Sequence, residues 1–202
     1  MYVAILAGGI ASGKSTAARE LEDRGALRLD LDALSRDVTA PGSATCERIA
    51  REFGADILDE DTGELRRAAL AARAFGSSES TARLEDIVHP AVRELLEQRL
   101  LEARDREVCI VEVPLLDRVE DLLERADEVI CVVCPLVVRR ERARARGMAV
   151  GDFDARVARQ PTDEYLRSHA DVVWENGGTY EELRSMIDLW WREHELAGWE
   201  HA

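Results

Sequence analysis

The stretch GGIASGKST, residues 8–16, constrains this chain more than any other. It contains the spacing G-x-x-x-x-G-K-[ST], with Gly8, Gly13, Lys14 and Ser15 at the defined positions. An apolar run precedes it and a helical pattern follows it, which is the context that a phosphate-binding loop requires. Glycines let the backbone N–H groups turn toward a phosphate chain, and the N-terminus of the following helix adds a positive dipole. The alternative is a glycine-rich turn that only caps a helix.

Lys14 is the only lysine in the chain, among 27 basic residues. A lysine ammonium is a compact charge on a flexible stem that reaches the β- and γ-phosphates of ATP, while the Ser15 hydroxyl binds Mg²⁺. Without a second lysine there is no N-K-x-D guanine signature, which disfavours a GTPase. We therefore predict ATP and Mg²⁺ as cofactors and Lys14 as a catalytic residue. The predicted ATP-binding residues of the loop are Gly8, Gly9, Ala11, Ser12, Gly13, Lys14, Ser15 and Thr16.

Length and charge narrow the classes of function. The 202 residues suit one sizeable domain, and the formal net charge of −14 disfavours a general nucleic-acid binder, which usually carries a basic surface. No apolar run is long enough to cross a bilayer, and the N-terminus has no secretory leader. We expect a cytoplasmic protein with no nucleic-acid or membrane partner. The CVVC pair, Cys131 and Cys134, is predicted to be two buried thiols rather than a metal or redox site.

Short β-rich runs alternate with longer helical patterns. The candidate strands are residues 2–7, 26–32, 108–113, 128–134 and 171–174, and several are apolar on both faces. This pattern predicts an α/β fold with a five-stranded parallel sheet flanked by helices.

A long stretch without a strand separates the second and third strands. Residues 84–103 within it have helical periodicity, and residues 75–81 are its most loop-like part. We expect a helical insertion at the carboxyl edge of the sheet. Near the C-terminus, Leu183, Ile187 and Trp190 recur at helical spacing, so the tail with Trp190, Trp191 and Trp199 is predicted to pack on the core.

Acidic residues follow two of the predicted strands. As part of a strand over 26–32, Asp30 and Asp32 would share one face at its carboxyl end, where ligands bind in open α/β sheets. Asp32 is the candidate general base that accepts a hydroxyl proton during phosphoryl transfer. The alternative is an aspartate that caps a helix starting near Ala33. Glu112, which emerges from an apolar run, is the candidate ligand of Mg²⁺ or its water.

The segment CPLVVRRERARARGM is rich in arginine. At helical spacing Arg142 and Arg146 share one face, and we predict that this face closes over ATP as a lid. The alternative is a solvated basic helix with Glu141 as a partner.

These motifs, in their order, resemble those of the dephospho-coenzyme A kinase family nearly from end to end. The resemblance rests on GGIASGKST, LDLDALSR, FGADIL, GELRRAAL, HP at residues 89–90, VEVPLL, ARVARQ and ADVVWENGG. It implies the P-loop kinase fold in a single domain over 1–202, with a helical coenzyme A-binding subdomain at 36–105 and an arginine-rich helical lid at 136–165. It also implies transfer of the γ-phosphate of ATP to the ribose 3′-hydroxyl of 3′-dephospho-coenzyme A, giving coenzyme A and ADP.

The resemblance assigns further roles by position. It implies that Asp32 is the base, that substrate contacts come from Asp32, Arg36, Arg67, His89 and Glu112, and that Asn176 and Gly177 lie near the adenine. His89 could equally be structural, fixed by the following proline. Other small-molecule kinases and a non-catalytic nucleotide-binding module remain as alternatives, and we expect a monomer or a small homo-oligomer.

The chain also departs from the family. Ala11 stands where the family usually has glycine, and alanine is small enough to keep the loop if its φ is negative. Glu112 stands where the family commonly has aspartate.

Overall fold

The computed structural model describes residues 1–119 and 125–194. The chain forms two compact units, residues 1–30 together with those from 103 onward, and residues 31–102.

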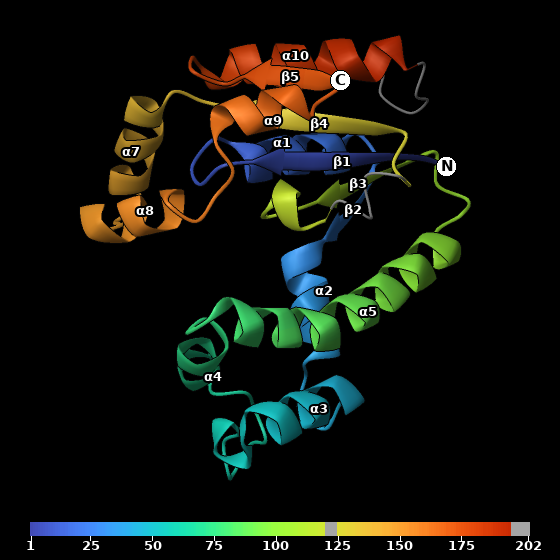
Figure 1. Cartoon of the computed structure of the whole chain (residues 1–202). Helices are drawn as coiled ribbons and strands as arrows, with labels where there is room; N and C mark the ends of the chain where they lie inside the picture. The colour runs from blue at the N-terminus through green and yellow to red at the C-terminus, as the bar shows by residue number, and fades with distance from the viewer. Residues whose placement is uncertain (120–124, 195–202) are drawn as a thin grey trace. The chain divides into compact units, whose positions relative to one another are not determined.

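The first unit contains a five-stranded parallel sheet with the strand order β2-β3-β1-β4-β5 (Figure 1). The predicted sheet is confirmed, and every strand lies within two residues of its expected bounds. The strands are β1 (Tyr2–Gly8), β2 (Leu27–Asp30), β3 (Val108–Glu112), β4 (Glu128–Val133) and β5 (Val172–Glu175). All five residues of β3 are buried, as expected for a central strand covered on both faces.

The sheet places the phosphate-binding loop at a change of direction in the strand order. β1 is the central strand, with β3 on one side and β4 on the other, and the chain crosses from one side of β1 to the other between β3 and β4. Ligands of open α/β sheets bind outside the carboxyl ends of the strands at such a point. The loop after Gly8 starts there, next to the ends of β3 and β4.

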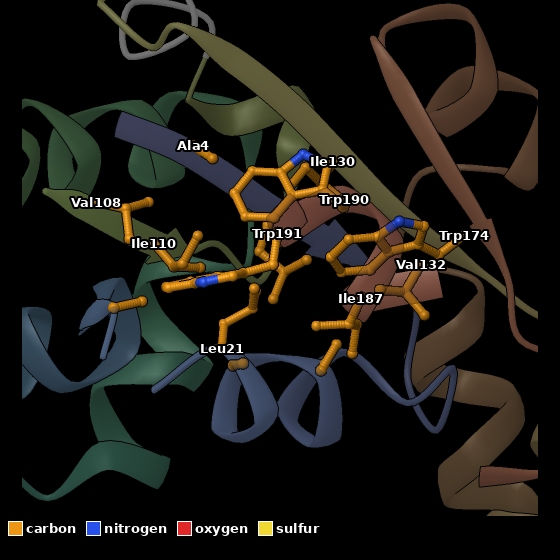
Figure 2. Packing of buried hydrophobic residues seen from close by; sticks show 14 of the residues in the cluster. Ala4, Leu21, Val108, Ile110, Ile130, Val132, Trp174, Ile187, Trp190 and Trp191 are labelled. Atoms are coloured by element: carbon orange, nitrogen blue, oxygen red, sulfur yellow. The ribbon is translucent and has the colours of Figure 1, made fainter. Parts of the chain in front are cut away.

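Two helices cover one face of the sheet, α1 (Lys14–Asp23) and α10 (Tyr180–Glu193). Their apolar residues meet those of the strands in one buried cluster (Figure 2). The labelled side chains include Leu21 of α1 and Ile187, Trp190 and Trp191 of α10, all at most 3% exposed. The prediction that this helix packs on the core is therefore confirmed; Trp199 lies outside the described residues.

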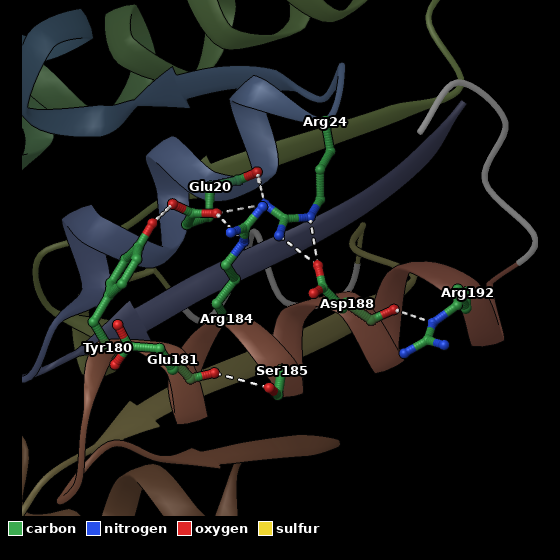
Figure 3. A network of polar contacts seen from close by, with 8 residues as sticks. All are labelled: Glu20, Arg24, Tyr180, Glu181, Arg184, Ser185, Asp188 and Arg192. Atoms are coloured by element: carbon green, nitrogen blue, oxygen red, sulfur yellow. Dashed lines mark hydrogen bonds and ion pairs between the residues drawn. The ribbon is translucent and has the colours of Figure 1, made fainter. Parts of the chain in front are cut away.

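A polar network also joins α1 to α10 (Figure 3). Arg24, whose side chain is 1% exposed, donates to Glu20 Oε2 at 2.7 Å and to Asp188 Oδ1 at 2.5 Å. Burial alone would raise the pKa of Glu20, but the hydrogen bonds from Tyr180 and Arg24 outweigh it and lower that pKa. The buried guanidinium is thus paired on both sides, as burial of a charge requires.

Within its described residues, the first unit also contains a short 3-10 turn (Leu116–Arg118), α7 (Leu136–Ala145), α8 (Val150–Val157) and α9 (Asp163–Ser168), and α9 packs against β4. Cys131 and Cys134 are buried, as predicted, and burial raises the pKa of Cys131 to about 12. Within the described residues, no helix is both long and apolar enough to span a membrane.

The second unit is helical, with α2 (Leu31–Val38), α3 (Ala44–Phe53), a short 3-10 turn (Ala55–Ile57), α4 (Arg67–Ala74) and α5 (Ser78–Glu102). Ile49, Phe53, Ile57, Ala74 and Ile87 form its core. One prediction is wrong here: residues 75–81 are a loop only as far as residue 77. The Ser77 hydroxyl accepts the Ser80 N–H at 3.1 Å, which satisfies a free donor at the start of α5 and lets the helix begin at Ser78.

Candidate active site

The phosphate-binding loop turns between β1 and α1 without room for side chains at its glycines. Gly13 caps α1 with φ 104°, a left-handed conformation that favours glycine. A Cβ atom on Gly13 would lie 2.0 Å from Asn176 Nδ2. The Ser12 N–H closes the turn by donating to Gly9 O at 3.0 Å. The glycine pattern that predicted the loop is thus required by its geometry.

Ala11 does not have the negative φ that alanine prefers. Its φ is +58°, and Ala11 is the only described non-glycine residue with a positive φ. A left-handed conformation costs an L-residue about 1–2 kcal/mol, because Cβ crowds the following carbonyl oxygen. Alanine therefore occupies this position under strain, and other contacts must hold the loop in place.

Lys14, Ser15 and Glu112 lie together at the end of β3. The Ser15 hydroxyl donates to Glu112 Oε1 at 2.8 Å, and Lys14 Nζ lies 3.7 Å from the same oxygen. Lys14 Nζ also donates to the Val113 carbonyl at 2.7 Å. Burial alone would raise the pKa of Glu112, but hydrogen bonds from Ser15 and Arg28, with the charge of Lys14, lower it below its ordinary value of 4.5. Glu112 is therefore an ionised carboxylate at neutral pH.

Arg28 of β2 is a partner of Glu112 that the sequence analysis missed. Its Nη2 donates to Glu112 Oε2 at 2.6 Å and its Nε to the same oxygen at 3.1 Å. The two carboxylate oxygens thus have separate tasks, since Oε1 faces Lys14 and Ser15 while Oε2 is held by Arg28. A signal existed in the sequence: a buried glutamate needs a cation, and Arg28 is the only basic residue of β2.

The residue types at this site suit Mg²⁺. Mg²⁺ prefers oxygen ligands and usually takes only one or two from a protein, the rest coming from phosphates and water. A hydroxyl and a carboxylate oxygen 2.8 Å apart, beside a phosphate-binding loop, provide that set. Across the described part of the chain, no group of three or more His, Cys, Asp or Glu residues forms another candidate metal site.

Asn176 and Arg142 meet beside the same loop. Asn176 is 5% exposed, and its Nδ2 donates to Ser12 O at 2.6 Å. Arg142 Nη1 donates to Asn176 O and Arg142 Nη2 to Gly178 O, each at 3.0 Å. These two predicted ATP-binding residues therefore join the phosphate-binding loop to the loop after β5. Gly177, the neighbouring predicted residue, is exposed.

Arg146 does not share the position of Arg142. It is the C-cap of α7 with φ −88° and ψ 8°, past the last helical residue, and its side chain is exposed. The expected common face therefore ends before Arg146, because the helix closes at Ala145.

Arg139 is the arginine of this segment that contacts the loop most closely, and the sequence analysis did not single it out. It is 4% exposed, and its Nε donates to Ile10 O at 2.8 Å. Gln160 Oε1 accepts the Ile10 N–H at 2.7 Å. Five arginines at similar spacing give no sequence signal for which one is buried.

Asp30 and Asp32 do not share a strand face. β2 ends at Asp30, whose register partner on β3 is Glu112, and α2 begins at Leu31. Asp32 is therefore an exposed residue in the first turn of α2. The expectation of a shared strand face is wrong because α2 begins at the residue after Asp30, with no loop between them.

The predicted acceptor-binding residues belong to three helices of the second unit. Arg36 lies in the last turn of α2, Arg67 begins α4, and His89 lies in α5, which continues through Pro90. All three side chains are exposed. Within the described residues, no hydrogen bond or ion pair joins one of them to another.

Comparisons with known proteins identify the family of this chain. The model of the family described as Dephospho-CoA kinase matches residues 2–182. A dephospho-CoA kinase of Corynebacterium diphtheriae is 40% identical over 196 residues, which cover 95% of this chain and 97% of that protein. The crystal structure of TT1252 from Thermus thermophilus has a TM-score of 0.82 and 32% identity, and the match covers 98% of both chains. A dephospho-CoA kinase structure from Campylobacter jejuni shares the fold, with a TM-score of 0.70, 22% identity, and coverage of 95% of this chain and 96% of that chain. The chain belongs to the dephospho-CoA kinase family and is therefore a kinase, an ATP-dependent phosphotransferase.

Proposed function

We propose a division of roles within this chain for the family reaction, transfer of the γ-phosphate of ATP to the ribose 3′-hydroxyl of 3′-dephospho-coenzyme A. A bond forms between the ribose 3′ oxygen and the γ-phosphorus, and the bond between that phosphorus and the β,γ-bridging oxygen breaks. The hydroxyl proton passes to Asp32, and the products are coenzyme A and ADP. The grouping of Lys14, Ser15 and Glu112 at the phosphate-binding loop carries the proposal.

Lys14 neutralises charge on the transferred group. Its Nζ donates to the Val113 carbonyl and lies 3.7 Å from Glu112 Oε1, and its side chain is 16% exposed. The Val113 carbonyl is a neutral acceptor that phosphate oxygens displace when ATP binds. A charge that is matched to the transition state lowers the barrier more than one that is matched to the bound substrate. The N–H groups of the loop hold the β-phosphate in place.

Ser15 and Glu112 are the residues that would hold Mg²⁺. When bound, the ion would neutralise negative charge on the phosphates. Arg28 keeps Glu112 oriented with Oε1 toward Ser15, and this pairing favours the ionised carboxylate that a metal site needs.

Asp32 is proposed as the base, and Arg36, Arg67 and His89 as residues that bind dephospho-coenzyme A. An exposed carboxylate at the start of α2 is open to an incoming hydroxyl. Asp32→Asn should lower kcat by roughly 10²–10⁴-fold, the usual share of general base catalysis, while ATP affinity stays close to wild type. Normal turnover in this variant would exclude Asp32 as the base. Asp37→Asn is the matched control on the same helix.

The activity test is ADP release by purified protein with ATP, Mg²⁺ and 3′-dephospho-coenzyme A. Parallel reactions contain adenosine, AMP, shikimate or gluconate as acceptor. Turnover with dephospho-coenzyme A alone, with coenzyme A as the product, supports the proposal. Turnover only with another acceptor would support the ATP site and overturn the acceptor assignment. ATP binding without transfer to any acceptor would favour a non-catalytic nucleotide-binding module.

We also propose that the protein acts in the cytoplasm as a monomer or small homo-oligomer, without nucleic-acid or membrane partners. The strongly acidic net charge of −14 supports the lack of nucleic-acid binding. Size-exclusion chromatography with light scattering measures the oligomeric state.

A further inference from the structure

Ile10 is held at both of its backbone polar groups by side chains from distant parts of the chain. Its N–H donates to Gln160 Oε1 at 2.7 Å, and its carbonyl accepts from Arg139 Nε at 2.8 Å. Arg139 Nη2 also donates to Gln160 Oε1 at 3.3 Å, which closes a ring of three contacts. We refer to Arg139 and Gln160 together as the loop clamp.

The loop clamp fixes two successive peptide planes of the phosphate-binding loop. Each peptide group is rigid and trans, so fixing its N–H or its C=O fixes both. Gln160 sets the plane between Gly9 and Ile10, whose carbonyl accepts the Ser12 N–H. Arg139 sets the plane between Ile10 and Ala11 and directs the Ala11 N–H to the side opposite the guanidinium.

The peptide plane between Ile10 and Ala11 directly precedes Ala11, the strained residue of the loop. Ala11 has φ +58°, a conformation that costs an alanine about 1–2 kcal/mol and a glycine almost nothing. Without an outside restraint, an alanine here would relax toward negative φ and turn its N–H in another direction. The clamp supplies the restraint just before the strained residue.

Burial and charge make the clamp stiff. Arg139 is 4% exposed, and its Nη1 lies 3.2 Å from Asp163 Oδ1, which balances the buried charge. Gly9 provides the space, because a Cβ there would lie 2.2 Å from Arg139 Nη2. Arg139 lies in α7, Gln160 lies between α8 and α9, and Asp163 begins α9. Ile10 is therefore held by α7 and by the segment between α8 and α9.

We infer that Arg139 and Gln160 are positioning residues that hold the phosphate-binding loop in its nucleotide-binding shape and thereby offset the strain at Ala11. Neither residue needs to touch ATP. The inference rests on the proposed role of this loop in binding ATP. It adds that part of the nucleotide affinity comes from Arg139 and Gln160, which contact the loop backbone rather than ATP.

The test is a double-mutant cycle read by calorimetric titration with ADP. Gln160→Ala removes one acceptor, and it should weaken ADP binding about tenfold, because the Ile10 N–H loses its partner. In an Ala11→Gly background, Gln160→Ala should weaken ADP binding only about threefold, since glycine adopts the required φ without strain. Gln98→Ala, at the other glutamine of the chain, is the control and should leave ADP affinity unchanged.

Arg139→Lys extends the test, because it keeps the charge and loses the Nε donor geometry. It should raise the KM for ATP more than it lowers kcat, whereas Arg167→Lys on α9 should change neither. Titrations are run well below the melting temperature, so that a variant that is only less stable binds ADP normally. Unchanged ADP affinity in Gln160→Ala, or an equal loss in both backgrounds, would overturn the inference. Failure of the wild type itself to bind ADP would instead refute the nucleotide site.

Discussion

Replacing Gly9 by alanine tests whether the contact between the phosphate-binding loop and Arg139 carries energy. A Cβ at this position would lie 2.2 Å from Arg139 Nη2, 2.5 Å from Cζ and 2.9 Å from Nη1. The φ of Gly9 is outside the left-handed region, so the backbone accepts alanine and only the contact opposes it. The guanidinium must therefore leave its place.

The expected cost follows from the contacts that Arg139 would lose. Its hydrogen bond to Ile10 O is 2.8 Å long, and its contacts with Asp163 and Gln160 are 3.2 and 3.3 Å. One hydrogen bond from a charged group contributes about 1.5–3 kcal/mol, and the longer contacts contribute less. Alanine in place of Gly9 also lowers the conformational entropy of the unfolded chain, which offsets about 0.4–1 kcal/mol of this loss. We expect a net loss of about 2–3 kcal/mol, or a melting temperature lower by roughly 4–12 °C for a chain of this size.

Differential scanning calorimetry measures this loss, and ADP titration shows whether the loop is disturbed as well. The matched control is Gly151→Ala in α8, where a Cβ meets nothing within 4 Å. Alanine in a helix should stabilise the protein there by about 0.5–1 kcal/mol. If Gly9→Ala melted like the wild type and bound ADP equally well, Arg139 would be free to move and the reasoning would fail.

Three further changes test the site and the core. Lys14→Arg should reduce kcat at least tenfold, because a planar fork cannot replace a compact ammonium at the γ-phosphate; full activity in steady-state assays would show that the site accepts either cation. The lowered pKa of Glu112 contributes stability that is present above its ordinary value of 4.5 and is lost as the pH falls through the lower folded value. Urea unfolding should therefore show Glu112→Gln less stable than wild type at pH 7 and the difference shrinking in acid; a difference independent of pH would contradict this assignment. Arg24→Met should cost about 3–5 kcal/mol in the same assay, because Glu20 and Asp188 lose their buried partner; a cost below 1 kcal/mol would show that water replaces the guanidinium.

The sequence predicted the strands well because each is a short apolar run between helical patterns. The residues at their ends were harder to predict. Asp32 follows Asp30 with strand-like spacing, yet α2 starts at Leu31, so the two carboxylates lie on different elements. The last residue of an edge strand depends on its neighbour, and β2 pairs with β3 only as far as the register of Asp30 with Glu112. Local spacing does not contain that information.

The contacts around the phosphate-binding loop also could not be predicted from the sequence. The arginine-rich segment offers several similar side chains, and only the packing of α7 beside the loop selects Arg139 for burial and Arg142 for the carbonyls of Asn176 and Gly178. Ala11 is a similar case. The sequence left its φ open, and the value of +58° accompanies the closed turn between Gly9 and Ser12.

The single lysine has a physical explanation in the different tasks of the cations around the loop. Arg28 and Arg139 hold fixed partners, a carboxylate and a backbone carbonyl, and the planar guanidinium suits such static pairing. Lys14 Nζ lies 3.7 Å from Glu112 Oε1 and also donates to the Val113 carbonyl, a neutral partner that phosphate can displace. An ammonium has three equivalent donors on a flexible stem and can change partners by rotation, whereas a guanidinium must turn its whole plane. Under the role proposed for Lys14, the position that exchanges partners during turnover is therefore the one at which arginine is the poorer choice.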